Sequence, residues 1–152
     1  MPPREMPDTI LFAARVSRGL TLLTQGTAYD ITTQQYLNPS DWNDHALTGF
    51  VVDDHVIVAQ DDQAKPDHLW CYTLGLSKFG MDELEIFQPR GLSDRSAKEL
   101  LTESAHEMIR IGQSPKVGTA FHLPILGCTI RIANYRTASP IGRTLSFREI
   151  KS

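Results

Sequence analysis

The shortness of the connections between apolar runs in the middle of the chain is the feature that most constrains its fold. Strand-like runs at residues 50–58, 68–74 and 83–87 follow one another closely, with connections too short to contain a crossover helix. Parallel neighbours in a sheet need such a crossover, whereas antiparallel neighbours do not. We therefore expect an α+β domain built on a mainly antiparallel sheet.

One long amphipathic helix is predicted after these strands, over residues 97–111. Ser93 is a suitable N-cap for it, and Gly112 is a suitable stop. Its apolar residues recur at helical spacing, and they are Ala97, Leu100, Leu101, Ala105, Met108 and Ile109. We expect this stripe to pack the helix on one face of the sheet.

Two hairpins are predicted before the helix. Apolar residues alternate over residues 9–16, which predicts a strand, and residues 20–24 would return as its partner. A second hairpin is expected over residues 47–60, with Asp53 and Asp54 in its tight turn, because aspartate tolerates the left-handed backbone that such a turn needs.

The length of 152 residues fits one domain, and 41% hydrophobic residues with 22% charged residues is typical of globular proteins. Residues 1–8 contain three prolines, so we expect a flexible start followed by a single domain over residues 9–152. Further strands are expected near 117–126, 128–132 and 145–150. No apolar run approaches the roughly 18 residues that span a bilayer, and no secretory signal is evident. A cytoplasmic protein without a membrane segment is therefore expected.

Charge is distributed unevenly along the chain. The net charge of −3 argues against nucleic-acid binding through the whole surface. Residues 109–152 hold seven bases and one acid, a formal charge of +6, whereas residues 41–67 hold one base and seven acids, a formal charge of −6. These acids are Asp41, Asp44, Asp53, Asp54, Asp61, Asp62 and Asp67. The two stretches could attract each other, form separate faces for partners, or lie in ordinary solvated loops.

No catalytic constellation, metal site or cofactor motif is predicted. The spacing of Glu103 and His106 resembles half of a carboxylate-bridged metal site, but no second helix carries a matching pair. Cys71 and Cys128 lie in apolar runs and are expected to be reduced core residues. A disulfide between them stays open if their strands are neighbours.

A candidate ligand site combines the turn after residue 72 with C-terminal arginines. An anionic ligand of nucleotide or flavin type would stack on aromatic rings and bind cationic side chains. The residues of this alternative are Trp70, Tyr72, Lys78, Arg131 and Arg148. The simpler interpretation places the aromatic residues in the core and the arginines on the solvent side of a sheet.

Residues 72–86, YTLGLSKFGMDELEI, resemble a segment of uncharacterised bacterial families. There an aromatic residue or histidine precedes Thr-x-Gly-Leu, a Phe-Gly or Leu-Gly pair follows, and a strand with an acid before Leu-x-apolar comes next. The resemblance covers residues 67–119, including Gly118. These families are known only as domains of unknown function, so the resemblance implies no catalytic residue. Some relatives occur near toxin and secretion genes, which implies an immunity or adaptor role.

Three hypotheses about function follow. The leading one is a non-enzymatic binding protein, immunity-like or an adaptor, that engages a basic protein partner through the acidic residues of 41–67. The alternative is a small-molecule enzyme or sensor that uses the Tyr72–Gly80 turn. The third is a purely structural or oligomer-forming module.

Overall fold

The computed structural model describes residues 5–89 and 94–151. Its N-terminal elements are α1 (Met6–Thr24), β1 (Ala28–Asp30), β2 (Gln35–Leu37) and the short 3₁₀ helices η1 (Asp41–Asp44) and η2 (Val52–Asp54). The following elements are β3 (Ile57–Lys65), β4 (His68–Leu74), the 3₁₀ helix η3 (Leu76–Phe79), β5 (Glu83–Pro89), α2 (Asp94–Ile111), β6 (Ala120–Leu123), β7 (Cys128–Ala138) and β8 (Leu145–Lys151).

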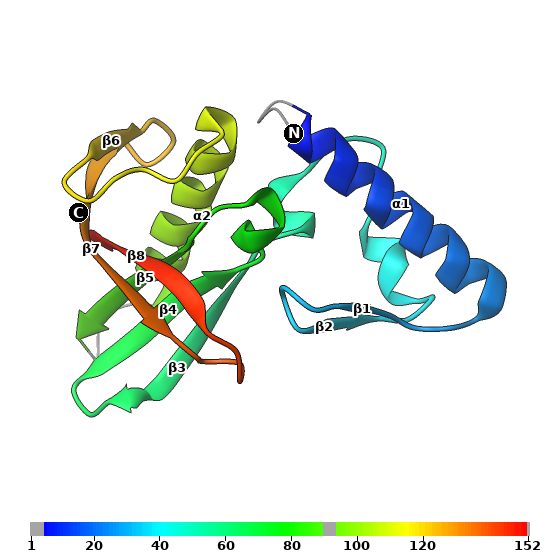
Figure 1. Cartoon of the computed structure of the whole chain (residues 1–152), viewed down its shortest axis with the longest axis horizontal. Helices are drawn as coiled ribbons and strands as arrows, with labels where there is room; N and C mark the ends of the chain where they lie inside the picture. Colours follow the sequence, from blue (N-terminus) through cyan, green and yellow to red (C-terminus); the bar gives the residue numbers. More distant parts are fainter. Residues whose placement is uncertain (1–4, 90–93, 152) are drawn as a thin grey trace.

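A six-stranded sheet in the order β3-β4-β5-β8-β7-β6 forms the body of the molecule (Figure 1). Every neighbouring pair in it is antiparallel except β5 and β8, which are parallel at the centre. The chain can place β8 beside β5 in parallel because α2 and the β6–β7 hairpin intervene between them. The expected α+β class with a mainly antiparallel sheet is confirmed.

The predicted helix is present as α2 and covers one face of the sheet (Figure 1). Its apolar stripe is buried as expected, with Ala97, Leu101 and Met108 fully inaccessible against Leu84 and Ile132. The expected N-cap, Ser93, lies outside the described residues. The opposite face of the sheet carries a smaller aromatic cluster.

Residues 6–24 form the helix α1, so the strands predicted at 9–16 and 20–24 are wrong. The alternation was misleading because α1 has apolar residues on both sides. Leu11 is buried against the N-terminal cluster, whereas Phe12 and Leu23 on other faces are 68% and 84% exposed. Pro7 in the first turn was the usable signal, because proline favours the first helical position. α1 begins within the segment expected to be flexible.

The hairpin expected over residues 47–60 is also wrong. Val52–Asp54 form η2, in which the backbone N–H of His55 donates to the carbonyl of Val52 at 2.9 Å. β3 begins only at Ile57, and it pairs with β4. Neither residue of the Asp53-Asp54 turn is the glycine or asparagine that most readily adopts a left-handed conformation, and the chain coils instead.

Two further expectations concern the cysteines and the membrane. Cys71 in β4 and Cys128 in β7 form no disulfide, and β5 and β8 lie between their strands. Cys71 is buried and Cys128 half-buried. Neither of the two described α-helices combines the length and the hydrophobicity that crossing a membrane requires.

Candidate functional site

The motif at residues 72–86 builds a tight turn around a buried carboxylate. Glu83 is 2% exposed and accepts hydrogen bonds from the Thr73 hydroxyl at 2.7 Å, the Gly75 N–H at 2.9 Å and the Ser77 N–H at 3.1 Å. Burial raises the pKa of this carboxyl group despite these donors. The N–H groups that could have held a ligand anion are thus occupied by the chain's own glutamate, so the turn connects strands, as expected.

Gly75 lets this turn approach the N-terminal segment closely. Its φ of +120° is a conformation that side chains rarely adopt, and an added Cβ would lie 2.2 Å from the carbonyl oxygen of His55. Because η3 is held this close to His55, Lys78 reaches the N-terminal hairpin.

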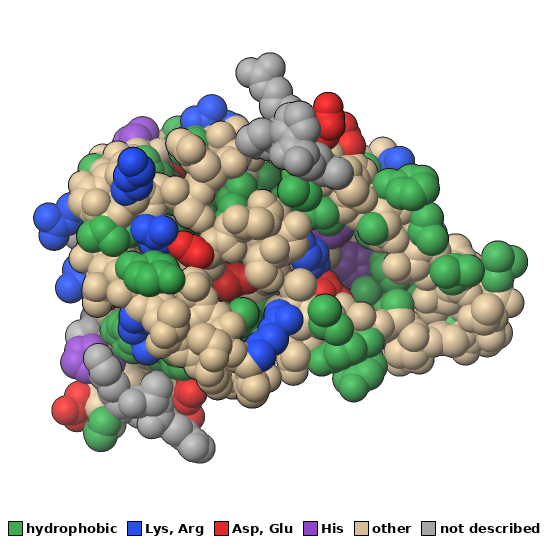
Figure 2. All heavy atoms as spheres, viewed as in Figure 1, with side chains coloured by type: hydrophobic (Ala, Val, Ile, Leu, Met, Phe, Trp, Pro, Cys, Tyr) green, Lys and Arg blue, Asp and Glu red, His purple; other side chains and the backbone are tan. Residues whose placement is uncertain are grey.

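A cavity of about 320 Å³ lies where these parts meet. Its walls come from α1, the β1–β2 hairpin, η1, η2 with the adjoining loop, and η3. Figure 2 shows a hollow at this boundary in which histidine, basic and acidic side chains gather beside hydrophobic ones. Two α1 arginines anchor the outer wall, since Arg15 donates to the carbonyl of Leu47 at 2.8 Å and Arg18 to that of Ala46 at 3.2 Å.

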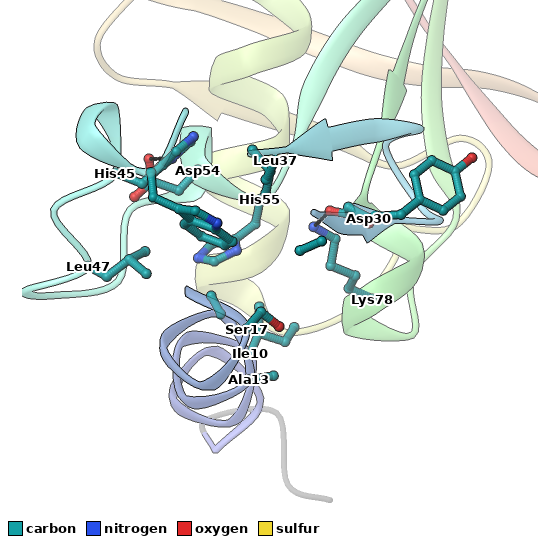
Figure 3. Close-up of a pocket in the computed structure, with 14 residues that line it drawn as sticks. Ile10, Ala13, Ser17, Asp30, Leu37, His45, Leu47, Asp54, His55 and Lys78 are labelled. Atoms are coloured by element: carbon teal, nitrogen blue, oxygen red, sulfur yellow. Dashed lines mark hydrogen bonds and ion pairs between the residues drawn. The ribbon is translucent and has the colours of Figure 1, made fainter. Parts of the chain in front are cut away.

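Two acid–base pairs line the cavity on either side of His55 (Figure 3). Lys78 Nζ contacts the Asp30 carboxylate, and His45 Nδ1 lies 2.9 Å from Asp54 Oδ1. Burial opposes ionisation of Asp30, but hydrogen bonds from Lys78 and Thr32 lower its pKa to about 2. Asp30 is therefore charged at neutral pH.

His55 is buried, 4% exposed, and its ring stacks on Phe50 with 5.2 Å between centroids. Burial, and next the positive charge of Lys78, lower its pKa to about 4, so the imidazole is neutral at pH 7. Its Nε2 is buried and has no hydrogen-bond partner, and the same is true of the indole Nε1 of Trp42. Both residues line the cavity.

A family model described as "Protein of unknown function (DUF4026) C-terminal" matches residues 55–138, more than half of the chain. The chain belongs to this family. No curated protein and no solved structure matches it significantly. The resemblance to a family of unknown function is thereby confirmed.

The DUF4026 match covers only some of the residues that line the cavity. His55 and Lys78 lie within the matched residues, whereas the other lining residues precede them in the chain. The site is therefore composite: the DUF4026 domain supplies a floor with one neutral histidine and one lysine, and the N-terminal segment supplies the remaining walls.

The seven predicted acids lie on separate elements. Asp41 and Asp44 lie in η1, Asp53 and Asp54 in η2, Asp61 and Asp62 in β3, and Asp67 in the turn between β3 and β4. Figure 1 places η1 below α1, and the β3–β4 turn lies at the far end of the sheet.

Histidines, and not the basic tail, contact two of these acids. Asp54 lines the cavity beside His45, and Asp53 Oδ1 lies 3.0 Å from His106 Nε2 on α2. Two tail arginines contact acids outside 41–67: Arg136 binds Glu85, and Arg148 binds Asp82 at 2.8 Å.

The residues of the alternative ligand site are dispersed. Lys78 reaches the cavity, but Tyr72 is 6% exposed in the aromatic cluster of the sheet. Arg148 lies over the ring of Tyr135 at 4.9 Å, and Arg131 is exposed on β7. Trp70 lies in the same cluster as Tyr72 and borders a different cavity.

This second cavity has a volume of about 510 Å³, and the charged side chains that line it form ion pairs with each other or with a neighbouring residue. Arg136 donates twice to Glu85 at 2.7 Å and lies 4.9 Å from the centroid of the Trp70 ring. Lys151 Nζ lies 3.5 Å from Glu149. Charged groups are paired in both cavities. Among the residues that the structure describes, only the first is lined by residues with a buried polar atom that lacks a partner, Trp42 and His55, so we prefer the first cavity as the functional site.

The best site residues were missed by sequence reasoning. Trp42, Asp30 and His55 carry no motif, and their proximity depends on α1 and on the η2 coil, both of which the sequence pattern misrepresented. Within residues 5–89 and 94–151, no group of three or more His, Cys, Asp or Glu side chains is arranged to hold a metal ion.

Proposed function

We propose that the chain binds a small molecule in the cavity between its N-terminal segment and the DUF4026 domain. The observation that carries this proposal is that two residues lining the cavity, His55 and Trp42, each hold a buried side-chain nitrogen without a hydrogen-bond partner. Buried polar groups in native proteins nearly always have partners. Leaving one unsatisfied costs about 1–3 kcal/mol. A ligand that supplies those partners would recover this free energy.

The shape and position of the cavity support the same proposal. A volume of about 320 Å³ falls at the small end of ligand pockets, which run from roughly 300 to 1,000 Å³. Such pockets combine apolar walls with a few polar groups that fix the ligand's orientation. This retains the small-molecule hypothesis from the sequence but moves it to a different set of residues, of which only Lys78 is shared.

A ligand screen with a matched pair of variants tests the proposal. Thermal unfolding is measured against a library of small uncharged compounds, and we expect binders that raise Tm, because a ligand of the native state stabilises it by mass action. Ala13→Phe places a ring at an exposed α1 position that lines the cavity. Val16→Phe places one at a position that is 44% exposed and outside it.

The shift should disappear in Ala13→Phe and persist in Val16→Phe. A library without binders, or binders that the Ala13→Phe variant retains, would contradict the proposal.

The protein-partner hypothesis stays a prediction, and one observation keeps it in view: Asp44, Asp62 and Asp67 are exposed. Reversing Asp44 and Asp67 to lysine leaves the cavity pairs intact. We expect weaker binding of a decalysine peptide by calorimetry at low salt, since exposed charges steer oppositely charged partners. Unchanged binding would remove the hypothesis.

A further inference from the structure

We infer that the cavity takes an uncharged, largely apolar carbonyl compound whose oxygen accepts a hydrogen bond from the Trp42 indole. This inference rests on the proposed function and specifies its ligand class. It follows from three properties of the cavity walls: their charges, their unsatisfied groups and their apolar surface.

The charges argue against an anion. The only lysine or arginine side chain among the cavity-lining residues described is Lys78, and it contacts the ionised carboxylate of Asp30. A second carboxylate, Asp54, lies in the same walls, and His55 is neutral at pH 7. An anionic ligand would enter a site with two carboxylates and one lysine, where removal from water is costly without a free cation.

The unsatisfied groups argue against a cation. An indole N–H is a donor only, so the Nε1 of Trp42 needs an acceptor, and an ammonium group supplies none. The two carboxylates that could attract a cation, Asp30 and Asp54, are already paired with Lys78 and His45. A carbonyl oxygen carries two lone pairs and no charge, so it satisfies the indole without adding a repulsive contact. The Nε2 of His55 serves as a second donor or as an acceptor, depending on its tautomer.

The rest of the wall is apolar. α1 contributes Ile10 and Ala13, and Leu37 and Leu47 contribute from β2 and the loop after η1 (Figure 3). Such walls suit a hydrocarbon body, because burying apolar surface is the main favourable term in binding. The ligand therefore has one polar end and an apolar remainder.

Three compounds with one body and different ends test this inference. Calorimetry compares 3-phenylpropanamide, which is neutral, with 3-phenylpropanoate and 3-phenylpropylammonium at pH 7 and fixed salt. We expect the amide to bind at least about tenfold more tightly than either ion. Trp42→Phe should weaken the amide about tenfold, which is the worth of one hydrogen bond. Trp70→Phe, which changes the other tryptophan, should leave amide affinity unchanged.

The outcomes separate this inference from the proposed function. Equal or tighter binding of either ion overturns the ligand class, while Ala13→Phe still reports on the cavity. Amide binding that survives Trp42→Phe overturns the assigned contact. If none of the three compounds binds although the library has yielded binders blocked by Ala13→Phe, the ligand class is wrong and the proposed function stands.

Discussion

The two tryptophans of the chain are almost equally buried, yet their indole N–H groups have opposite surroundings. Trp70 in β4 is 5% exposed, and its Nε1 donates to the buried carboxylate of Glu85 at 2.7 Å. Trp42 in η1 is 4% exposed, and its Nε1 has no partner. Burial is the same for both rings, so the difference lies in the polar groups that the surrounding elements supply.

The same difference separates the sheet from the N-terminal segment. The sheet buries two carboxylates, Glu83 and Glu85, and each accepts three hydrogen bonds. Of the six buried side-chain atoms without a partner in the described part of the chain, four belong to residues 18–55. Those four residues are Arg18, Thr33, Trp42 and His55. The two sheet carboxylates thus have their partners, and Gln88 in β5 is the sheet residue among the six. Most of the unpartnered atoms lie instead in the N-terminal segment, where a ligand could supply partners.

The largest effect is expected where the two regions touch. Gly75→Ala adds a Cβ that would lie 2.2 Å from the backbone of His55, at a φ of +120°. We expect unfolding free energy to fall by about 3 kcal/mol or more, because backbone cannot move aside cheaply. Gly80→Ala is the control, since its φ of +70° is also strained but its Cβ would meet open space, and it should cost about 1 kcal/mol. Urea denaturation measures both, and equal losses would refute the close contact.

A comparison of the ion pairs should show the next largest effect. Glu85→Leu removes the acceptor of both Arg136 and Trp70, and we expect a loss of about 3 kcal/mol because the buried Trp70 indole and the partly exposed Arg136 guanidinium both lose their partner. Lys78→Met breaks a partly exposed pair with Asp30 and should cost only about 1 kcal/mol. The same denaturation assay measures both losses. A larger loss for Lys78→Met would contradict the expectation that the ion pair within the sheet stabilises the fold more than the ion pair at the cavity.

His55 should make stability depend on pH. Its folded pKa of about 4 lies below its usual value of 6.5, and the groups that influence it are Lys78, Asp54, Asp30 and His45. In the unfolded chain His55 binds a proton below about pH 6.5, whereas in the folded chain it binds one only below about pH 4. The free energy of unfolding therefore decreases as pH falls through this window.

Between pH 7 and pH 4.5 the contribution of His55 to this loss should reach about 2 kcal/mol, and His55→Gln should remove that contribution. His122→Gln, at an exposed strand position, serves as the control and should behave like the parent protein. Denaturation at the two pH values provides the measurement. An unchanged pH dependence in His55→Gln would show that folding does not lower the pKa of His55, which would contradict its burial beside Lys78.

The smallest effect concerns the tryptophans themselves. Both Trp→Phe changes remove the same atoms from a buried site. Only Trp70→Phe also removes a hydrogen bond that exists in the ligand-free protein, the one from Trp70 Nε1 to Glu85. We expect Trp70→Phe to cost about 1 kcal/mol more than Trp42→Phe in the ligand-free protein. If the two losses were equal, the claim that Trp42 lacks a partner would fail.

Sequence patterns predicted the sheet region well and the N-terminal segment poorly. α2 follows from its apolar residues at helical spacing, and β4, β5 and β8 follow from short runs rich in apolar and aromatic residues. α1 was not predicted, because it carries apolar residues on its exposed side as well as on its buried side. Phe12 and Leu20, for example, are 68% and 59% exposed. Periodicity reports contrast between faces, so it is uninformative where both faces are apolar.

The candidate site was out of reach for a related reason. Lys78 could be singled out because it stands in a glycine-bounded turn, but its partner Asp30 lies 48 residues away. Trp42 and His55 share no spacing that marks a site, and tertiary contacts alone bring them together. Glu83 and Glu85 look like solvated strand residues in the sequence, although both are buried by donors from other elements.

Nuclear magnetic resonance of the two indole N–H groups tests the account most directly, with Trp70→Phe assigning the pair. We predict that, without ligand, the Trp70 proton resonates downfield, as a hydrogen-bonded indole does, and the Trp42 proton resonates upfield of it. Adding 3-phenylpropanamide should move the Trp42 resonance downfield and leave that of Trp70 in place. A Trp42 resonance that is already downfield without ligand, and that stays unmoved when the amide is added, would contradict the account.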